Sequence, residues 1–315
     1  MLGSKILNRL CSGIYGGFIV TTTPRLILEC FPVKKRARAT TAFSFAICTG
    51  VAISFTPGFL YGDEYIVKYW RLFFMIPSIL SMLRIVIIYA FFNHDSPSQY
   101  SLSKTEANYR KMEPKINNVI QKFSPTIRDY RDSRGEVNAL RDVMVMETGF
   151  WKKITSNLCD RRKFWPLITV IAFQMWPTMS GLCFTEFYST VIYDELLYPG
   201  FGYSLTFWNG IMVFCAGLSI FLFVDKFERR SIIINGCLLQ IGLMYFLTIA
   251  FYCQNVWMLM ISSMFYTFVV YFSYMGVCFL YANEIAESFN VAVGLVMFWI
   301  LRCILAKVIP LQIKT

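Results

Sequence analysis

The sequence contains little of what enzymatic chemistry requires. With one histidine, His94, among 315 residues, it offers no plausible Ser-His-Asp or Cys-His site and no H-E-x-x-H zinc motif. It also lacks a Walker phosphate loop, a G-x-G-x-x-G motif and any C-x-x-C pair. The ten cysteines are scattered, mostly within apolar runs, as small buried hydrophobic residues are. We therefore expect no enzyme, no cofactor and no metal site.

Charge is scarce as well. Only 16% of the residues are charged, against about one-quarter in ordinary soluble domains, and 56% are hydrophobic. The mean hydropathy is +0.51, and a water-soluble fold could not bury this much apolar surface. The net charge of +11 does not indicate a nucleic-acid partner, because such a protein needs a basic face on a soluble scaffold. The lipid bilayer is the partner that this composition predicts.

Apolar runs long enough to cross a bilayer recur along the chain. A hydrocarbon core about 30 Å thick needs about 20 residues of helix. Eight such runs occur, at roughly 8–31, 38–61, 70–92, 165–192, 204–224, 231–253, 256–283 and 290–311. Lipid excludes unpaired backbone groups, and no run alternates at period two as barrel strands do. The predicted fold class is therefore an all-α membrane protein of about eight transmembrane helices.

A polar, basic stretch divides the predicted spans into two groups. Residues 1–92 hold three spans, 93–164 form a basic loop, and 165–315 hold five spans. The loop is either a solvated segment or a small helical module on the cytoplasmic side. Further basic segments at 32–38 and 225–230 share its side if the spans alternate, and the positive-inside rule makes that side cytoplasmic. The amino terminus would then start outside without a signal sequence, which indicates that earlier spans are missing.

The most specific pattern lies near the amino terminus. It reads Arg9-x3-Gly13-x3-Gly17-x6-Pro24-x4-Glu29-x2-Pro32-x3-Arg36. Gly13 and Gly17 predict a seam that another helix approaches closely. The spacing resembles the fourth span of the sugar-transporter family of the major facilitator superfamily, although Asn8 and Ala37 replace two family glycines.

The resemblance continues in register along the chain. Trp70-Arg71 and Pro77 resemble the sixth family span, and Asp95-Ser96-Pro97 resembles the signature that follows that span. The seventh span is matched by Gln174, Ser180-Gly181 and Tyr188-Ser189. Asp225 with Arg229-Arg230 resembles the loop after the eighth span, and Glu284 resembles the end of the tenth span. Ser98 and Glu228 depart from the family pattern. The match runs from the fourth to about the eleventh of twelve spans. It implies that three spans are absent at the front and one at the back.

This resemblance implies a carrier that moves a hexose or a related small polar solute by alternating access. We expect a multi-pass protein of the plasma membrane rather than of an internal membrane, with any protein partner unspecified. Seven charged residues match the family's cytoplasmic gate, which is paired when the transporter faces outward: Glu29, Arg36, Asp95, Asp225, Arg229, Arg230 and Glu284. The alternative is that they are ordinary helix-terminus and positive-inside charges.

The family's sugar-contacting residues are largely replaced. Two glutamines of its seventh span correspond to Pro177 and Thr178, and its asparagine corresponds to Cys183. The broken tenth span appears at 273–279 without either family proline. The polar residues that remain as candidate substrate-binding groups are Gln174, Thr178, Ser180 and, in the fifth span, Ser44. Interhelical hydrogen bonds are their alternative role.

Two further questions stay open at this point. The lost cavity residues also suit a second function class, a non-transporting sensor, assembly partner or decayed gene product. Charges within apolar runs, at Arg25, Arg84, Glu186, Arg302 and Lys307, are costly in lipid and often functional. Glu186 is suited either to bind a proton or to pair with an arginine.

Overall fold

The computed structural model describes residues 13, 16–24, 26–27, 30–91, 113–114, 117, 121, 161–182, 185–186, 189–196, 201–278, 280–282 and 288–313. In this part of the chain every regular element is helical, which confirms the predicted all-α class. Most of the predicted basic loop lies outside the described residues, so the choice between a solvated segment and a helical module stays open.

Two compact units make up the chain. Unit 1 comprises 1–25, 37–56 and 154–315, and unit 2 comprises 26–36 and 57–153. The helix α2 (Val33–Phe91) contributes to both. Its 59 residues exceed the roughly 20 needed for one crossing, so it holds both predicted spans 38–61 and 70–92. The predicted division at 92 and 164 stays a prediction.

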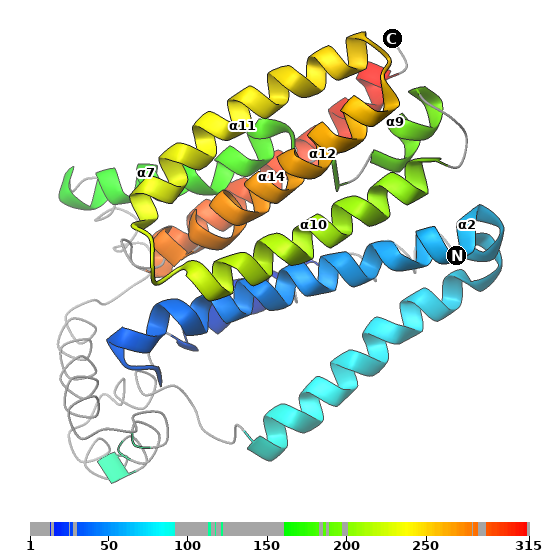
Figure 1. The fold of residues 1–315 in the computed structure, drawn as a ribbon. Coiled ribbons are helices and arrows are strands. Elements are labelled where there is room, and N and C mark those ends of the chain that lie inside the picture. The colour runs from blue at the N-terminus through cyan, green and yellow to red at the C-terminus, as the bar shows by residue number, and fades with distance from the viewer. Residues whose placement is uncertain are drawn as a thin grey trace. The chain divides into compact units, whose positions relative to one another are not determined.

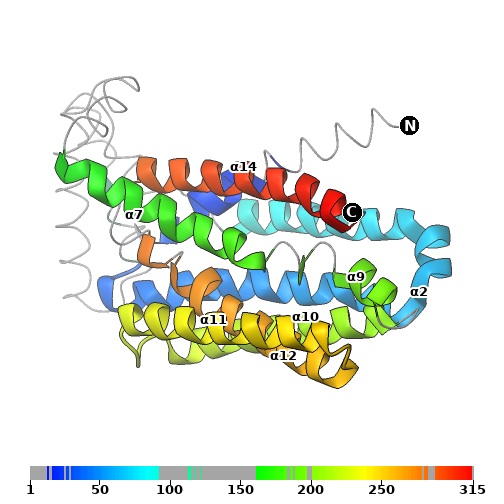
Figure 2. The same cartoon turned by 90° about the horizontal axis from the view of Figure 1, so that it is seen from above.

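The other helices whose bounds are defined among the described residues belong to unit 1, and Figure 1 labels most of them. They are α7 (Arg161–Pro177), η1 (Thr178–Leu182), α9 (Ser189–Leu196), α10 (Phe201–Phe223), α11 (Arg229–Tyr252), α12 (Val256–Val270), η2 (Tyr271–Cys278) and α14 (Ser288–Ile313). Within this unit α12 contacts both α10 and α11, and α14 packs along α7, as Figure 2 shows. Asn255 caps α12, since its side chain accepts hydrogen bonds from the backbone N–H groups of Trp257 and Met258.

Five of the described helical stretches are long and apolar enough to cross a membrane. They are 35–60, 201–223, 229–252, 256–282 and 290–308, and each corresponds to one of the eight predicted spans. Of the other three, 8–31 lies partly outside the described residues, 70–92 is the second half of α2, and 165–192 is interrupted. Apolar side chains on the outer face of α11, such as Leu238, Ile241 and Tyr245, are exposed, as lipid-facing residues are.

Glycines let α10 approach the first half of α2 closely. A Cβ built on Gly210 would lie 3.0 Å from Cδ2 of Phe55, and one on Gly217 would lie 2.7 Å from the Cβ of Cys48. No heavy atom of the described residues lies within 4 Å of a Cβ built on Gly13 or Gly17, so the seam predicted there stays a prediction. Close packing of small residues occurs on another helix, since spacing alone does not reveal which face of a helix meets a neighbour.

The predicted span 165–192 is broken near its middle. Pro177 ends α7, and the chain continues through the π-helical turn η1, where Gly181 has a φ of 97°. This left-handed conformation suits glycine, which lacks a Cβ. The Tyr266 hydroxyl donates a hydrogen bond to the backbone oxygen of Ser180 at 2.5 Å. This hydrogen bond satisfies a backbone carbonyl beside the break, because a backbone polar group away from water needs a partner within the protein.

A second π-helical segment, η2, continues α12. It overlaps most of the stretch 273–279, where the sequence predicts a family-like break without prolines. Close contacts surround it: a Cβ on Gly276 would meet the side chain of Ile220, and one on Gly236 would meet Ser273. Wide helical turns change the direction in which side chains point, and Tyr271 at the start of η2 lines the site described next.

Candidate functional site

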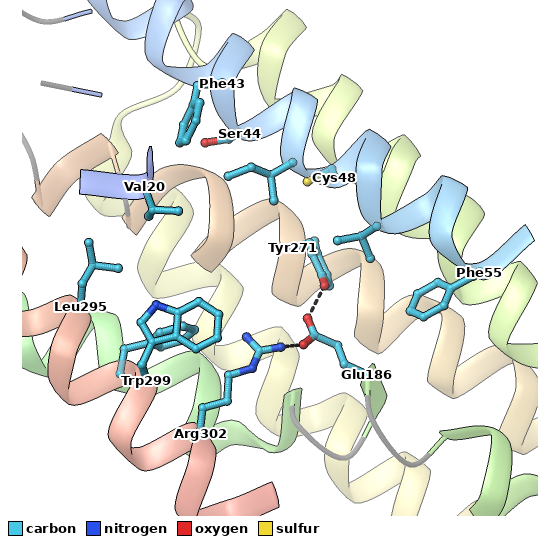
Figure 3. Close-up of a pocket in the computed structure, with 13 residues that line it drawn as sticks. Val20, Phe43, Ser44, Cys48, Phe55, Glu186, Tyr271, Leu295, Trp299 and Arg302 are labelled. Carbon is cyan, nitrogen blue, oxygen red and sulfur yellow. Dashed lines mark hydrogen bonds and ion pairs between the residues drawn. The ribbon is translucent and has the colours of Figure 1, made fainter. Parts of the chain in front are cut away.

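A cavity of about 310 Å³ lies within unit 1. The first half of α2 forms one wall, and η2, α14 and the helical residues 185–186 form the others (Figure 3). The lining residues are Val20, Phe43, Ser44, Ile47, Cys48, Val51, Phe55, Glu186, Tyr271, Leu295, Phe298, Trp299 and Arg302. Segments far apart in the sequence thus meet around a space of the size that small-molecule sites have.

A charged cluster lies at one edge of this cavity. The guanidinium of Arg302 forms an ion pair with Oε2 of Glu186, and the Tyr271 hydroxyl donates a hydrogen bond to Oε1 of the same carboxylate. The side chains of Arg302 and Glu186 are only 11% and 13% exposed. Burial makes each charge dependent on the other, because a lone charge at this depth would be strongly unfavourable. Figure 3 shows both interactions as dashed lines.

Two aromatic rings of α14 contact Arg302, which lies on the same helix. The guanidinium carbon of Arg302 lies 5.5 Å from the ring centres of both Phe298 and Trp299. These two rings meet edge to face with their centres 5.3 Å apart. Cation–π attraction in such a geometry contributes about 0.5–2 kcal/mol, so α14 itself positions the guanidinium at the cavity.

Of the four predicted substrate-binding residues, Ser44 lines this cavity. Gln174 on α7 and Thr178 on η1 are buried, and among the described residues none of their side-chain polar atoms has a hydrogen-bond partner. Gln174 abuts α14, since a Cβ on Gly294 would lie 2.9 Å from its Oε1. Ser180 donates to the backbone oxygen of Pro177 at 2.8 Å, an ordinary contact within a helical turn.

The predicted charge gate is only partly within the described residues. Glu29, Asp95 and Glu284 lie outside them. Asp225, between α10 and α11, forms an ion pair with Arg38 of α2 at 3.1 Å. Arg36 donates from Nε to the backbone oxygen of Phe31 at 2.9 Å within unit 2. Of the two remaining arginines, Arg229 is half-buried and Arg230 is exposed.

Sequence reasoning missed several residues of the site. It singled out Glu186 and Arg302 as charges within apolar runs, and the structure joins them. It gave no role to Tyr271, Trp299 or Arg38, because one tyrosine or tryptophan among many, and one arginine in a basic run, carry no signal by themselves. Among the described residues no group of three His, Cys, Asp or Glu side chains is placed to hold a metal ion.

Comparison with known proteins identifies relatives of this chain. The family model for sugar (and other) transporters matches residues 1–312. Curated proteins yield no match. The chain is similar to the major facilitator superfamily proton:xylose symporter XylE bound to 6-bromo-6-deoxy-D-glucose, with a TM-score of 0.70 and 18% identity over 94% of this chain and 61% of that one.

The chain is also similar to a second solved structure. It is the partially occluded, inward-open conformation of the xylose transporter XylE from E. coli, with a TM-score of 0.62 and 18% identity. The match covers 89% of this chain and 59% of that chain, so the present chain spans about three-fifths of the length of XylE. At this identity the likeness establishes the fold. Because the family model covers nearly every residue, this multi-pass membrane protein belongs to the sugar (and other) transporter family.

Proposed function

We propose that the protein carries a hexose or a related small polar solute across a membrane by alternating access. The observation that carries this proposal is the cavity of about 310 Å³ between α2 on one side and η2 and α14 on the other. A carrier of this kind needs a central space whose walls come from separate helical groups, so that they can part on either side in turn. Two solved structures of similar fold are those of a xylose transporter.

Two predicted substrate-binding residues suit a carrier that changes conformation during transport. Gln174 and Thr178 bury polar atoms that have no hydrogen-bond partner in the described part of the chain, and such burial is costly unless another group satisfies these atoms at another stage of the cycle. We assign them to contacts with solute hydroxyl groups in a second conformation of the cycle. Ser44, at the cavity wall, and Ser180 complete the proposed set.

The cytoplasmic gate is proposed from the charges at helix ends. Asp225, Arg229 and Arg230 lie around the connection between α10 and α11, and Arg38 joins them through its pair with Asp225. Pairs that are half-exposed contribute little to stability, about 0–1 kcal/mol, and can therefore open and close. Glu29, Arg36, Asp95 and Glu284 are the further members that the family register supplies.

The proposed location is the plasma membrane. Fluorescence microscopy of a tagged chain, together with labelling of surface lysines on intact cells, tests it. Co-localisation with markers of internal membranes would contradict this assignment.

A flux assay tests the carrier function. The purified chain is placed in liposomes preloaded with unlabelled D-xylose or D-glucose, and uptake of the labelled sugar is measured against labelled L-glucose. We expect accelerated exchange of a D-sugar, and a Ser44→Phe variant that fills the cavity should abolish it. Leu238→Phe, on the exposed face of α11, is the matched control and should retain exchange. Flux equal to that of protein-free liposomes would support the non-transporting alternative.

A further inference from the structure

The two sides of the cavity differ in chemistry. The side formed by α2 carries apolar side chains four residues apart, and this spacing places them along one face of the helix: Phe43, Ile47, Val51 and Phe55. The other side carries the charged side chains among the described lining residues, Glu186 and Arg302, with the hydroxyl group of Tyr271 beside them. Figure 3 shows α2 above these polar groups. A solute that fills the cavity therefore needs a polar edge and an apolar edge.

The Glu186 carboxylate can accept more hydrogen bonds than it receives from its neighbours. A carboxylate has about four acceptor positions on its two oxygens. Among the described residues, Tyr271 occupies one position on Oε1 and Arg302 occupies one on Oε2. The other positions suit two hydroxyl groups on adjacent carbon atoms, the arrangement found in sugars. Because a sugar is neutral, it binds without opening the ion pair, and Glu186 keeps the charge that makes it a strong acceptor.

The α2 side of the cavity has few hydrogen-bonding groups. Ser44 contributes one hydroxyl group, and the thiol of Cys48 is a weak donor. A sugar hydroxyl group that is buried against the apolar side chains of this helix gives up its hydrogen bonds to water without replacement. A methyl group at the same place gains free energy by leaving water. This side therefore favours a carbon substituent that lacks a hydroxyl group.

We infer that the cavity selects 6-deoxyhexoses, in which a methyl group replaces the CH2OH group on C5. The hydroxyl groups on C2 and C3 would bind the Glu186 carboxylate, and the methyl group would lie against Ile47 and Val51. In a pyranose ring C2 lies across from C5, so these substituents point to opposite edges and reach both sides of the cavity. Ser44 would bind the hydroxyl group on C4. This inference rests on the proposed carrier function, because it names the class of sugar that the same cavity takes.

Three labelled sugars test the inference in liposomes that contain the full chain. D-Glucose is the reference, and 6-deoxy-D-glucose and 2-deoxy-D-glucose each lack one hydroxyl group, at opposite edges of the ring. Initial exchange rates are compared at low sugar concentration. We expect 6-deoxy-D-glucose to exchange about tenfold faster than D-glucose, since its methyl group needs no partner, and 2-deoxy-D-glucose about tenfold slower, since it loses a hydrogen bond to a carboxylate. Faster exchange of both deoxy sugars, or slower exchange of both, would overturn the inference.

Two substitutions of Ile47 test the apolar side. Threonine and valine have nearly the same shape, so Ile47→Thr and Ile47→Val differ in one hydroxyl group and share any effect of the smaller side chain. Ile47→Thr offers a partner to the C6 hydroxyl group of D-glucose and should reduce the preference for 6-deoxy-D-glucose by at least about threefold. Ile47→Val should retain that preference. An equal preference in the two variants would overturn the placement of the methyl group against α2.

Glu186→Gln tests the polar side. The amide has one acceptor oxygen and no charge, so the difference between D-glucose and 2-deoxy-D-glucose should shrink from about tenfold to about threefold or less. The preference for 6-deoxy-D-glucose should persist, because the α2 side is unchanged. An undiminished difference in a folded Glu186→Gln protein would overturn the role of Glu186. If this variant does not fold, the three sugars and the Ile47 variants still decide.

The outcomes separate this inference from the carrier function. Equal exchange of the three sugars, at rates above those of protein-free liposomes, would overturn the sugar selection and support the carrier. Where no sugar exchanges, calorimetry measures binding of each sugar to the full chain in detergent. Affinity that falls in the order 6-deoxy-D-glucose, D-glucose, 2-deoxy-D-glucose would then support the selection and contradict the carrier. The absence of both exchange and binding would overturn both proposals.

Discussion

Gly217 of α10 lies directly against Cys48 of α2, at a separation that leaves no room for a side chain. A Cβ on Gly217 would lie 2.7 Å from the Cβ of Cys48 and 3.1 Å from its sulfur. Cys48 belongs to a buried core with Val213 and Ala216 of α10. Because Ser44 and Cys48 also line the cavity, this contact fixes the position of one cavity wall.

Gly217→Ala should therefore destabilise the protein. The added methyl group overfills a packed contact, which typically costs about 1–3 kcal/mol. Gly242→Ala is the matched control, since Gly242 lies within α11 and no heavy atom of the described residues lies within 4 Å of the new Cβ. That change should be neutral or stabilising by about 0.5–1 kcal/mol, because alanine favours helix. Thermal unfolding in detergent measures both, and equal melting temperatures would refute the close contact.

Tyr266→Phe should weaken the broken span between α7 and α9. The variant removes the part-buried hydrogen bond to the Ser180 oxygen, and loss of such a bond costs about 0.5–1.5 kcal/mol. Tyr245→Phe on the exposed face of α11 removes the same hydroxyl group without that loss. Melting temperatures compare the two variants, and faster proteolysis between 178 and 190 in Tyr266→Phe would locate the effect. A Tyr266→Phe protein as stable as Tyr245→Phe would show that the bond is dispensable.

Reversal of the Arg38–Asp225 pair tests the proposed gate. The side chains are 63% and 39% exposed, so Arg38→Asp or Asp225→Arg alone should change stability by less than about 1 kcal/mol. Each single change should nevertheless slow solute exchange in liposomes, because like charges would then meet at the gate. The double variant Arg38→Asp/Asp225→Arg should recover the exchange rate. Failure of this recovery, with both proteins folded, would remove the pair from the gate.

Removal of one member of the Glu186–Arg302 pair should be costly. Arg302→Met leaves a buried carboxylate without its cation, and loss of one partner of a buried pair typically costs about 3–5 kcal/mol. The double variant Glu186→Gln/Arg302→Met removes both charges and should be more stable than Arg302→Met alone. A double-mutant cycle of thermal stabilities gives the coupling. Purely additive effects would mean that the two side chains do not depend on each other.

Gln174→Leu separates a structural role from a substrate role. The Gln174 amide is buried and has no hydrogen-bond partner among the residues that the structure describes, so an apolar side chain of similar size should keep or raise the melting temperature. Exchange of D-xylose should fall at least several-fold if the amide contacts the solute. Unchanged exchange in a well-folded Gln174→Leu protein would exclude Gln174 from the solute path.

Much of the helical organisation follows from the sequence. The runs 204–224, 231–253 and 290–311 predict α10, α11 and α14 to within about three residues, because long apolar stretches have one stable conformation in lipid. The break at 165–192 was harder to foresee. Pro177 marks the end of a helix in sequence, but the positive φ of Gly181 and the supporting Tyr266 hydroxyl depend on residues far along the chain.

The candidate site was predictable only in parts. Ser44, Glu186 and Arg302 stand out as polar or charged residues in apolar runs, since lipid makes each of them expensive. Their association with Tyr271 and Trp299 depends on which faces of α14 and η2 turn inward. The π-helical geometry of η2 departs from the regular helical period, and the inward face of α14 is set by its packing against other segments.

The sequence by itself therefore determined the membrane setting, the helical class and the family register, because these follow from local hydropathy and from residue spacing along the chain. Only the tertiary structure decided that Gly210 and Gly217 of α10 lie so close to α2 that a side chain would not fit between them. It also decided that Glu186, Tyr271 and Arg302 meet at one cavity. Both depend on the rotation of each helix about its axis, which is set by packing between segments distant in sequence.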